Sequence, residues 1–384
     1  MASPSTPLRA SPSTAPRTKR QPYLDWLRGI AVIVMVAAHV TDAWTRVEDR
    51  QRDLYGYTVI IAGLAAPLFL FLAGLTLSMA ASARATAVGH RAAARMACVR
   101  GLQIFALAFL FRLQAQLLGW GPLVNLLKVD ILNIMGLAML AAAILWSLSS
   151  HRVVRLALFA LATAALAMST PLVREAGWLA TLPDAMEAYV RPLAGRTNFA
   201  LFPWAGFLLG GAITGELVQA AHGDGAERRL QRGLLIAGIA GIAVAYALSF
   251  QPSIYPNANF WTSSPTFFFM RLGLNTALVP AAWAIDRFHV FARRRWATLF
   301  TAPDVPGRVI TTLGRSSLFV YWIHVEMAYG AIALPLRRAM PLELSLLGTL
   351  LLCALLYAIV RWKDRKVQGV ELKGPIRILS PILR

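Results

Sequence analysis

A chain of 384 residues with 57% hydrophobic residues, 15% charged residues and a mean hydropathy of +0.57 lacks the composition of a soluble domain, in which roughly 25% of residues are charged. Its formal charge of +20 would suit nucleic-acid binding, but the basic residues gather in alternate loops between apolar runs, so we expect no nucleic-acid partner. The two cysteines, Cys98 and Cys353, are isolated, which excludes a disulfide framework and a CxxC motif.

The chain begins with a segment rich in Ser, Pro and Ala, residues 1–22, which is predicted to be a disordered tail rather than a signal peptide. Ten apolar runs follow, each close to the length that crosses a hydrocarbon core. They are 24–44, 57–81, 97–118, 124–147, 153–170, 198–220, 232–250, 266–286, 309–330 and 343–361. All should be helices, because backbone exposed to lipid must satisfy its own hydrogen bonds. The sequence therefore predicts an all-α polytopic bundle of about ten transmembrane helices over residues 23–362, followed by a basic tail, 363–384.

Lys and Arg residues divide unevenly between the two sides of this predicted bundle. With the N-terminus in the cytoplasm, 26 of the 38 fall on the cytoplasmic side and 9 in the outer loops. Such an excess is typical of cytoplasmic loops. We therefore predict that both termini are cytoplasmic.

The first apolar run, LDWLRGIAVIVMVAAHVTDAW, carries four ionisable side chains, Asp25, Arg28, His39 and Asp42. At about 100° per residue all four share one face of a helix, and Arg28 and His39 are about 16.5 Å apart along its axis. Ionisable groups at membrane depth are costly against lipid, so the stripe should face a protein-lined, watery interior. His39 is predicted to act as a general base, with Asp42 one turn later orienting its ring.

Simpler interpretations fit the same residues. Asp25 and Arg28 lie near the predicted cytoplasmic interface, where they can pair with each other or extend toward water. His39 also fits a neutral structural histidine whose hydrogen bonds are satisfied inside the bundle.

The sequence LDWLRGIAVIVMVAAH, followed by AAPLFLFLAGLTLSM at 65–79, resembles the bacterial relatives of heparan-alpha-glucosaminide N-acetyltransferase. It is similar, more distantly, to other membrane acyltransferases that modify extracytoplasmic glycans. Further matches run in family order: VDILNIMGLAML at 129–140, LFPWAGFLLGG at 201–211, SSPTFFFMRLGL at 263–274 and LGRSSLFVYWIHVEMAYG at 313–330.

This resemblance implies a bacterial inner-membrane enzyme that moves an acyl group from acetyl-CoA, or another acyl-CoA, to an amine or hydroxyl of an extracytoplasmic glycan or amino sugar. It implies no metal, and it leaves a homo-oligomer open. An Arg and a His spaced as Arg28 and His39 are required in the glycan-modifying relatives. In the lysosomal branch, the proposed catalytic histidine lies in the loop after the first core helix. The corresponding loop here, TRVEDRQRDLYGY, has no histidine, so His39 is the substitute candidate.

Candidate residues occur in later runs as well. His324 should lie in the outer half of its helix, as His39 does, so the two rings can converge, and Tyr321 can share the face of His324. Arg271 has no acidic partner four residues away, and Asp130 is one possible partner. Substrate binding and structural pairing both fit Asp25, Asp130 and Arg271, and Tyr321 is expected to contact substrate.

The chain has no Walker A loop, GxGxxG, HExxH or GxSxG motif, which leaves nucleotide hydrolysis, Rossmann cofactors, zincin chemistry and the hydrolase elbow without support. Coenzyme A would have to be held by the cytoplasmic Arg clusters, whose guanidinium groups suit phosphates. Two other functions fit the buried ionisable groups: a transporter with a proton or substrate route, and a noncatalytic membrane sensor or scaffold.

Overall fold

The computed structural model describes residues 21–119, 123–295, 305–367 and 382. These residues form helices and contain no strand, only isolated β-bridges that pair Thr45 with Met340 and Val129 with Thr197. The α-helices are α1 (Pro22–Trp44), α2 (Asp53–Ala62), α3 (Ala65–Val88), α4 (His90–Gly119), α5 (Ile131–Ser147), α6 (Arg152–Glu175), α7 (Asp184–Val190), α8 (Leu201–Ala220), α9 (Asp224–Ser249), α10 (Pro265–Arg295), α11 (Val305–Arg315), α12 (Ser317–Tyr329) and α13 (Leu342–Val367). Four 3-10 turns, η1 (Glu48–Gln51), η2 (Leu123–Leu127), η3 (Gly177–Thr181) and η4 (Ala331–Leu336), join them.

The predicted all-α membrane bundle is confirmed. Among the described residues, eight helical stretches are long and apolar enough to cross a membrane. The two other predicted spans are shorter or broken: α5 has 17 residues, and the run 309–330 divides between α11 and α12.

The predicted tails differ from the structure at their edges. Residues 1–20 and most of the segment 363–384 lie outside the described residues. However, α13 continues to Val367, and the side chain of Lys363 is buried, with its Nζ 3.1 Å from Ser316 Oγ. Ile382 is also buried, against the main apolar cluster. Two described residues of this segment, Lys363 and Ile382, therefore pack against the bundle.

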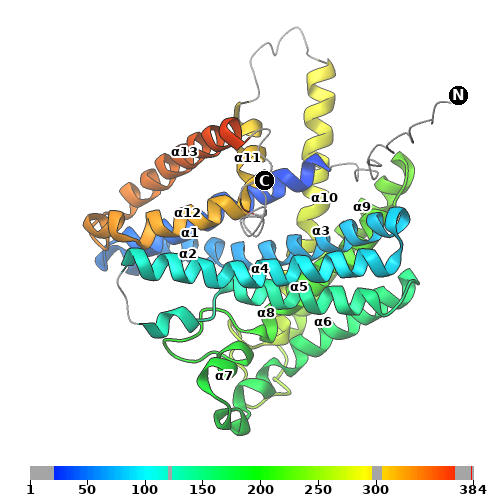
Figure 1. The fold of residues 1–384 in the computed structure, drawn as a ribbon, viewed down its shortest axis with the longest axis horizontal. Coiled ribbons are helices and arrows are strands. Elements are labelled where there is room, and N and C mark those ends of the chain that lie inside the picture. Colours follow the sequence, from blue (N-terminus) through cyan, green and yellow to red (C-terminus); the bar gives the residue numbers. More distant parts are fainter. Residues whose placement is uncertain (1–20, 120–122, 296–304, 368–381, 383–384) are drawn as a thin grey trace, which may run out of the picture.

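Helix α1 occupies the centre of the bundle and contacts α3, α10, α11, α12 and α13. Figure 1 shows α12 and α13 on one side of α1, and α4, α5 and α6 on the other. Extensive contacts join α3 to α8, α4 to α5 and α9 to α10. The arrangement places α1 and α12 opposite α3, α4 and α5.

Glycines allow the closest of these approaches. A Cβ atom at Gly211 of α8 would overlap the carbonyl oxygen of Phe71 in α3, and one at Gly74 would overlap that of Leu208. Small residues spaced in this way bring helix backbones together in membranes, where packing replaces the hydrophobic effect as the main attraction between helices. The α3–α8 pair therefore forms a tightly packed wall.

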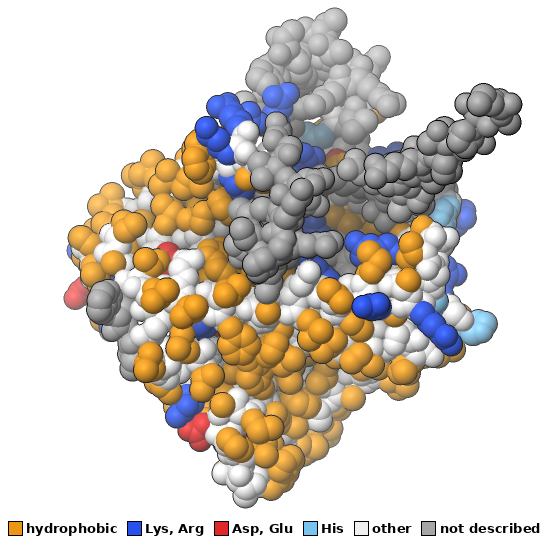
Figure 2. Space-filling view, viewed as in Figure 1, with side chains coloured by type: hydrophobic (Ala, Val, Ile, Leu, Met, Phe, Trp, Pro, Cys, Tyr) orange, Lys and Arg blue, Asp and Glu red, His pale blue; other side chains and the backbone are white. Residues whose placement is uncertain are grey.

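The outer surface of the bundle is largely apolar, as a lipid-facing surface requires. Figure 2 shows hydrophobic side chains over much of the visible face, with Lys and Arg toward its upper and right-hand edges. Helix α2 buries none of its residues, and Tyr57, Val59, Ile60 and Ile61 are all more than half exposed.

Buried polar side chains also link the helices inside the bundle by hydrogen bonds. Glu216 of α8 is 1% exposed, and its Oε2 accepts hydrogen bonds from Arg155 of α6 at 2.7 and 3.2 Å. Its Oε1 accepts from Ser78 at 2.8 Å, from Ser82 at 2.6 Å and from Trp146 at 2.9 Å. One carboxylate thus joins α3, α5, α6 and α8.

A second polar contact fixes the start of α13. The carboxylate of Asp49, in η1, accepts the backbone N–H of Leu342 at 2.9 Å and the Nε–H of Arg46 at 3.0 Å. These bonds hold the pKa of Asp49 below its usual range, because they stabilise the ionised form. The loop after α1 is thereby tied to the last helix.

Candidate functional site

A cavity of about 1920 Å³ lies between α1 and α12 on one side and α3, α4 and α5 on the other. Its lining begins near the first residues of α1 and continues to the last residues of that helix, so it follows much of the depth of the bundle. Two ends can be distinguished by their charged side chains.

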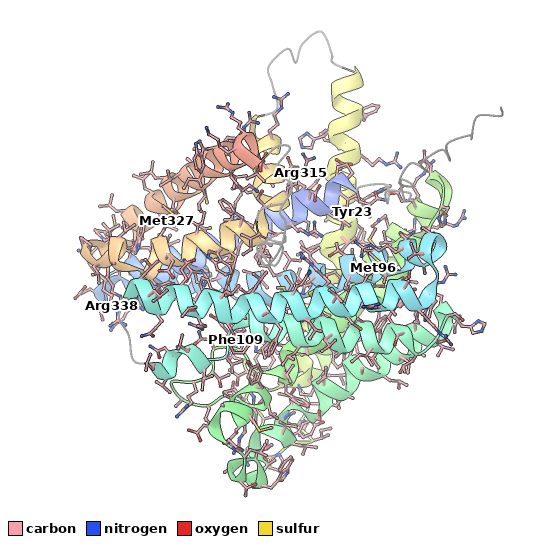
Figure 3. The ribbon with its side chains drawn as sticks, viewed as in Figure 1. Tyr23, Met96, Phe109, Arg315, Met327 and Arg338 are labelled. Atoms are coloured by element: carbon pink, nitrogen blue, oxygen red, sulfur yellow. The ribbon has the colours of Figure 1, made fainter. Side chains whose placement is uncertain are left out.

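One end, called here the basic end, is lined by guanidinium groups. Antiparallel packing brings together the start of α1, the end of α3, the start of α4 and the end of α11, and Figure 3 labels Tyr23, Met96 and Arg315 in this part of the molecule. The arginines that line the basic end are Arg28, Arg84, Arg91, Arg95, Arg100 and Arg315. No carboxylate lies among the described lining residues at this end, which makes it suitable for an anion of several charges.

Asp25 does not line the cavity, although its sequence suggested a substrate contact. Its side chain is buried, with Oδ1 3.3 Å from Nη1 of Arg28 and Oδ2 3.5 Å from Nε of Arg315. The carboxylate lies behind the arginines because α11 packs directly on the first turns of α1, where Gly314 meets the Asp25 carbonyl. Asp25 therefore positions two guanidinium groups of the basic end.

The middle of the cavity is mainly apolar, although Thr76 and Gln103 also line it. Its walls include Met35 of α1, Phe69 and Leu72 of α3, Met135 of α5 and Phe319 of α12. About 16.5 Å along α1 separates Arg28 from His39, given a rise of about 1.5 Å per residue. A ligand held at the basic end must have a long arm to reach His39.

The other end, called here the distal end, contains a pair of histidines. His39 Nδ1 lies 2.7 Å from Nε2 of His324, and the two rings are nearly parallel, with centroids 5.0 Å apart and an interplanar angle of 16°. His39 lines the cavity, whereas His324 is 0% exposed and lies behind it. The structure thus brings together two imidazoles that are 285 residues apart in the sequence.

The hydrogen bonds of this pair define its tautomers. His324 Nδ1 lies 2.8 Å from the carbonyl oxygen of Val320, which can only accept, so Nδ1 carries the proton. In a neutral His324, Nε2 is then an acceptor, and His39 Nδ1 must donate to it. This leaves the lone pair of a neutral His39 on Nε2, and no described residue forms a hydrogen bond with that atom.

Asp42 does not orient His39 as the sequence suggested. Its Oδ2 accepts the hydroxyl of Tyr329 at 2.7 Å, and its Oδ1 lies 3.6 Å from Nη1 of Arg50. Asp42 lies three residues after His39 on α1, and its carboxylate points past the imidazole of His39. His324 makes the orienting contact instead. Tyr329 lies edge-on to His39 with ring centroids 5.6 Å apart, so the hydroxyl bonded to Asp42 belongs to a ring that contacts His39.

Asp130 and Arg271 are not partners. Asp130 caps α5 and accepts from Arg112 of α4 at 2.7 Å, so it lines the distal end as a paired carboxylate. Arg271 is not among the cavity-lining residues; its guanidinium lies over the ring of Phe267 at 4.1 Å, within α10. Helical periodicity alone could not show which side of α10 faces lipid. Tyr321, in contrast, lines the cavity, with its ring centroid 5.8 Å from that of His324.

Three cavity side chains that contribute charge at the distal end are not among the site residues selected from the sequence: Arg112, Lys128 and Glu326. Each is a charged residue at or within an apolar run, and that position is itself a signal of function. Among the described residues, no three His, Cys, Asp or Glu side chains come together in a way that could hold a metal ion.

Comparison with protein families identifies the family of the chain. The family model described as heparan-alpha-glucosaminide N-acetyltransferase, catalytic, matches residues 20–252. The chain belongs to this family. No curated protein gives a significant match to the chain.

The heparan-alpha-glucosaminide N-acetyltransferase match makes this chain a membrane acetyltransferase of multi-pass architecture. The matched part runs from α1 to α9 and includes His39 and the arginines contributed by α1, α3 and α4. His324 and Arg315 lie beyond residue 252, so the cavity is completed by helices outside the matched part.

Proposed function

We propose that the protein transfers an acetyl group from acetyl-CoA, bound at the basic end, to an amine or hydroxyl of a glycan or amino sugar at the distal end. The excess of Lys and Arg in alternate loops supports a bacterial-type inner membrane, with both termini and the basic end on the cytoplasmic side. The observation that carries the proposal is one cavity with an arginine cluster at one end and an accessible imidazole toward the other.

The acyl donor is inferred from the positive charge of the basic end and from the distance between that end and His39. Six arginines suit the several phosphate charges of coenzyme A. The apolar middle section and the separation of about 16.5 Å between Arg28 and His39 suit a thioester at the end of an extended arm. A small donor such as acetyl phosphate would suit the arginines but would not extend along the apolar section to His39.

Removing charge from the basic end should weaken donor binding specifically. We expect the double variant Arg91→Gln/Arg95→Gln to raise the KM for acetyl-CoA by about tenfold or more, because a hydrogen bond to a charged group contributes roughly 1.5–3 kcal/mol. The measurement is thiol release by purified protein over a range of donor concentrations. Arg229→Gln, at an exposed arginine of α9 outside the cavity, is the matched control. An unchanged KM in the double variant would place the phosphates elsewhere.

The proposed chemistry uses Nε2 of His39. This atom takes the proton of the acceptor N–H or O–H as the acceptor atom bonds to the thioester carbonyl carbon. The C–S bond then breaks and the proton passes to the sulfur, so the products are the acetylated acceptor and free coenzyme A. A two-step route through an acyl group on Nε2 would use the same atom, and thiol release without acceptor would reveal it.

His324 is proposed as a positioning residue that fixes the tautomer of His39. We expect His324→Phe to lower kcat by about 10²-fold while the KM for acetyl-CoA stays within about twofold, because the ring would lose its acceptor for Nδ1–H but the basic end would be intact. Steady-state kinetics with both substrates varied measures the two effects separately. A merely structural role would change both constants, or the yield of folded protein, together.

The overall function is tested with purified protein in nanodiscs. We expect release of free thiol from acetyl-CoA only when an amino sugar such as glucosamine is present, with acetylated sugar formed in equal amount. Flux of substrate into proteoliposomes without thioester cleavage would instead support the transporter. Ligand-induced stabilisation without turnover would support a sensor or scaffold.

A further inference from the structure

The rim of the distal end is built from two loops held together by backbone pairing. The N–H of Val129 donates to the carbonyl of Arg196 at 2.8 Å, and the N–H of Asn198 donates to the carbonyl of Val129 at 2.9 Å. This pairing makes a parallel β-bridge between Val129 and Thr197. The loop before α5 and the loop before α8 therefore have a fixed register.

The pairing directs specific side chains into the cavity. Val129 is fully buried, and successive side chains of extended backbone point in opposite directions, so Lys128 and Asp130 project away from it. Both of these residues, and Asn198 on the neighbouring loop, line the cavity. The rim thus presents an ammonium group, a carboxylate and an amide side by side.

The charges at the distal end do not all have partners within the described chain. Asp130 is paired with Arg112, and Asp42 with Tyr329 and Arg50. Lys128 has no hydrogen bond or ion pair with another described side chain, and neither does Glu326 on the opposite wall.

Lys128 and Glu326 are each only partly exposed where they line the cavity. A partly buried charge without a partner is unfavourable, and a ligand of opposite charge removes that cost.

We propose that Lys128, with Asn198 beside it, binds an acidic group of the acceptor and so determines acceptor specificity. The acceptor class is then an amino sugar that also carries a carboxylate or a phosphate, with its amino group toward Glu326 and His39. Lys128 suits either anion, because an ammonium is a compact charge with three donors and no preferred bidentate geometry. This inference rests on the proposed function, because it names the acceptor of the same site.

The experiment compares three acceptors with the full-length protein in nanodiscs: glucosamine, glucosamine 6-phosphate and the 6-carboxylate analogue of glucosamine. We expect kcat/KM for at least one acidic sugar to exceed that for glucosamine by about tenfold, because a hydrogen bond between two charged groups is stronger than a neutral one. The two acidic sugars distinguish a phosphate from a carboxylate. In Lys128→Gln the ratio of acidic to neutral acceptor should fall toward one, and Lys128→Arg should restore it.

Arg337→Gln is the matched control, since it removes one positive charge from an exposed position near the same end of the bundle but outside the cavity, and it should keep the wild-type ratio. A ratio near one in the wild type, or an unchanged ratio in Lys128→Gln, would overturn the inference.

Measuring sugar binding in the absence of acetyl-CoA distinguishes a failure of this inference from a failure of the proposed function. If no acceptor releases thiol, thermal unfolding with each sugar still reports on Lys128. A stabilising shift by an acidic sugar that exceeds the shift by glucosamine and disappears in Lys128→Gln supports the inference. Equal shifts, or none, contradict it.

Discussion

Replacement of His39 by alanine is expected to lower kcat/KM for the acceptor by about 10²- to 10⁴-fold, the usual contribution of a positioned general base. The reason is local: Nε2 is the only nitrogen of the His39–His324 pair that is left free to accept a proton from the cavity. Thiol release with saturating acetyl-CoA and varied acceptor measures the loss. Because the variant leaves a space within the cavity, added imidazole should restore part of the rate.

The matched control is His151→Ala, at an exposed histidine before α6 whose side chain makes no capping bond. It should behave like the wild type. Full activity in His39→Ala would remove the base from the mechanism. Loss of activity together with loss of folded protein would be separated by thermal unfolding, in which His39→Ala should stay close to the control.

Replacement of Glu216 by leucine is expected to reduce the free energy of unfolding by about 3–5 kcal/mol, since it would leave the guanidinium of Arg155 buried without a counter-charge. It would also leave the donors of Ser78, Ser82 and Trp146 without their acceptor. Denaturation in mixed detergent and SDS measures the free energy. Acetyl transfer by the fraction that stays folded should change little, because Glu216 does not line the cavity.

A double-mutant cycle tests whether the buried pair is the cause. Arg155→Met/Glu216→Leu removes both charges and should cost clearly less than the sum of the two single variants, because no lone charge remains inside the bundle. Additive costs would mean that the two side chains act independently. A loss below about 1 kcal/mol in Glu216→Leu would show that the network is dispensable.

Hydropathy predicted the spans well, because lipid imposes one simple requirement on every helix that faces it. It did not reveal the division between α2 and α3 near Gly63, because that interruption lies within continuous apolar sequence, or that between α11 and α12 near Ser316, where a few polar residues lie inside a longer apolar run. Such breaks depend on tertiary contacts, for example the packing of Gly314 against the first turns of α1.

The candidate site could be predicted only in part from the sequence, for a related reason. An ionisable residue within an apolar run is itself a sign of function, so His39, Arg28 and His324 could be selected from the sequence alone. The shared depth of His39 and His324 indicated that their rings can converge, but sequence did not show which residue orients His39, since that contact comes from α12 rather than from Asp42 in the same helix. Glu216 carried the same signal, an acid within an apolar run, but its role depends on Arg155 in another helix.

The hydrogen bond between the two imidazoles also has a consequence for biosynthesis. Its donor is in α1 and its acceptor lies 285 residues later, so the whole stretch between them must be made before the two rings can meet. Until α12 has been inserted, nothing in the described chain fixes which nitrogen of the earlier ring bears hydrogen. Under the proposed mechanism, a nascent chain that stops before α12 would therefore lack a poised base, and it would not cleave the thioester until assembly is complete.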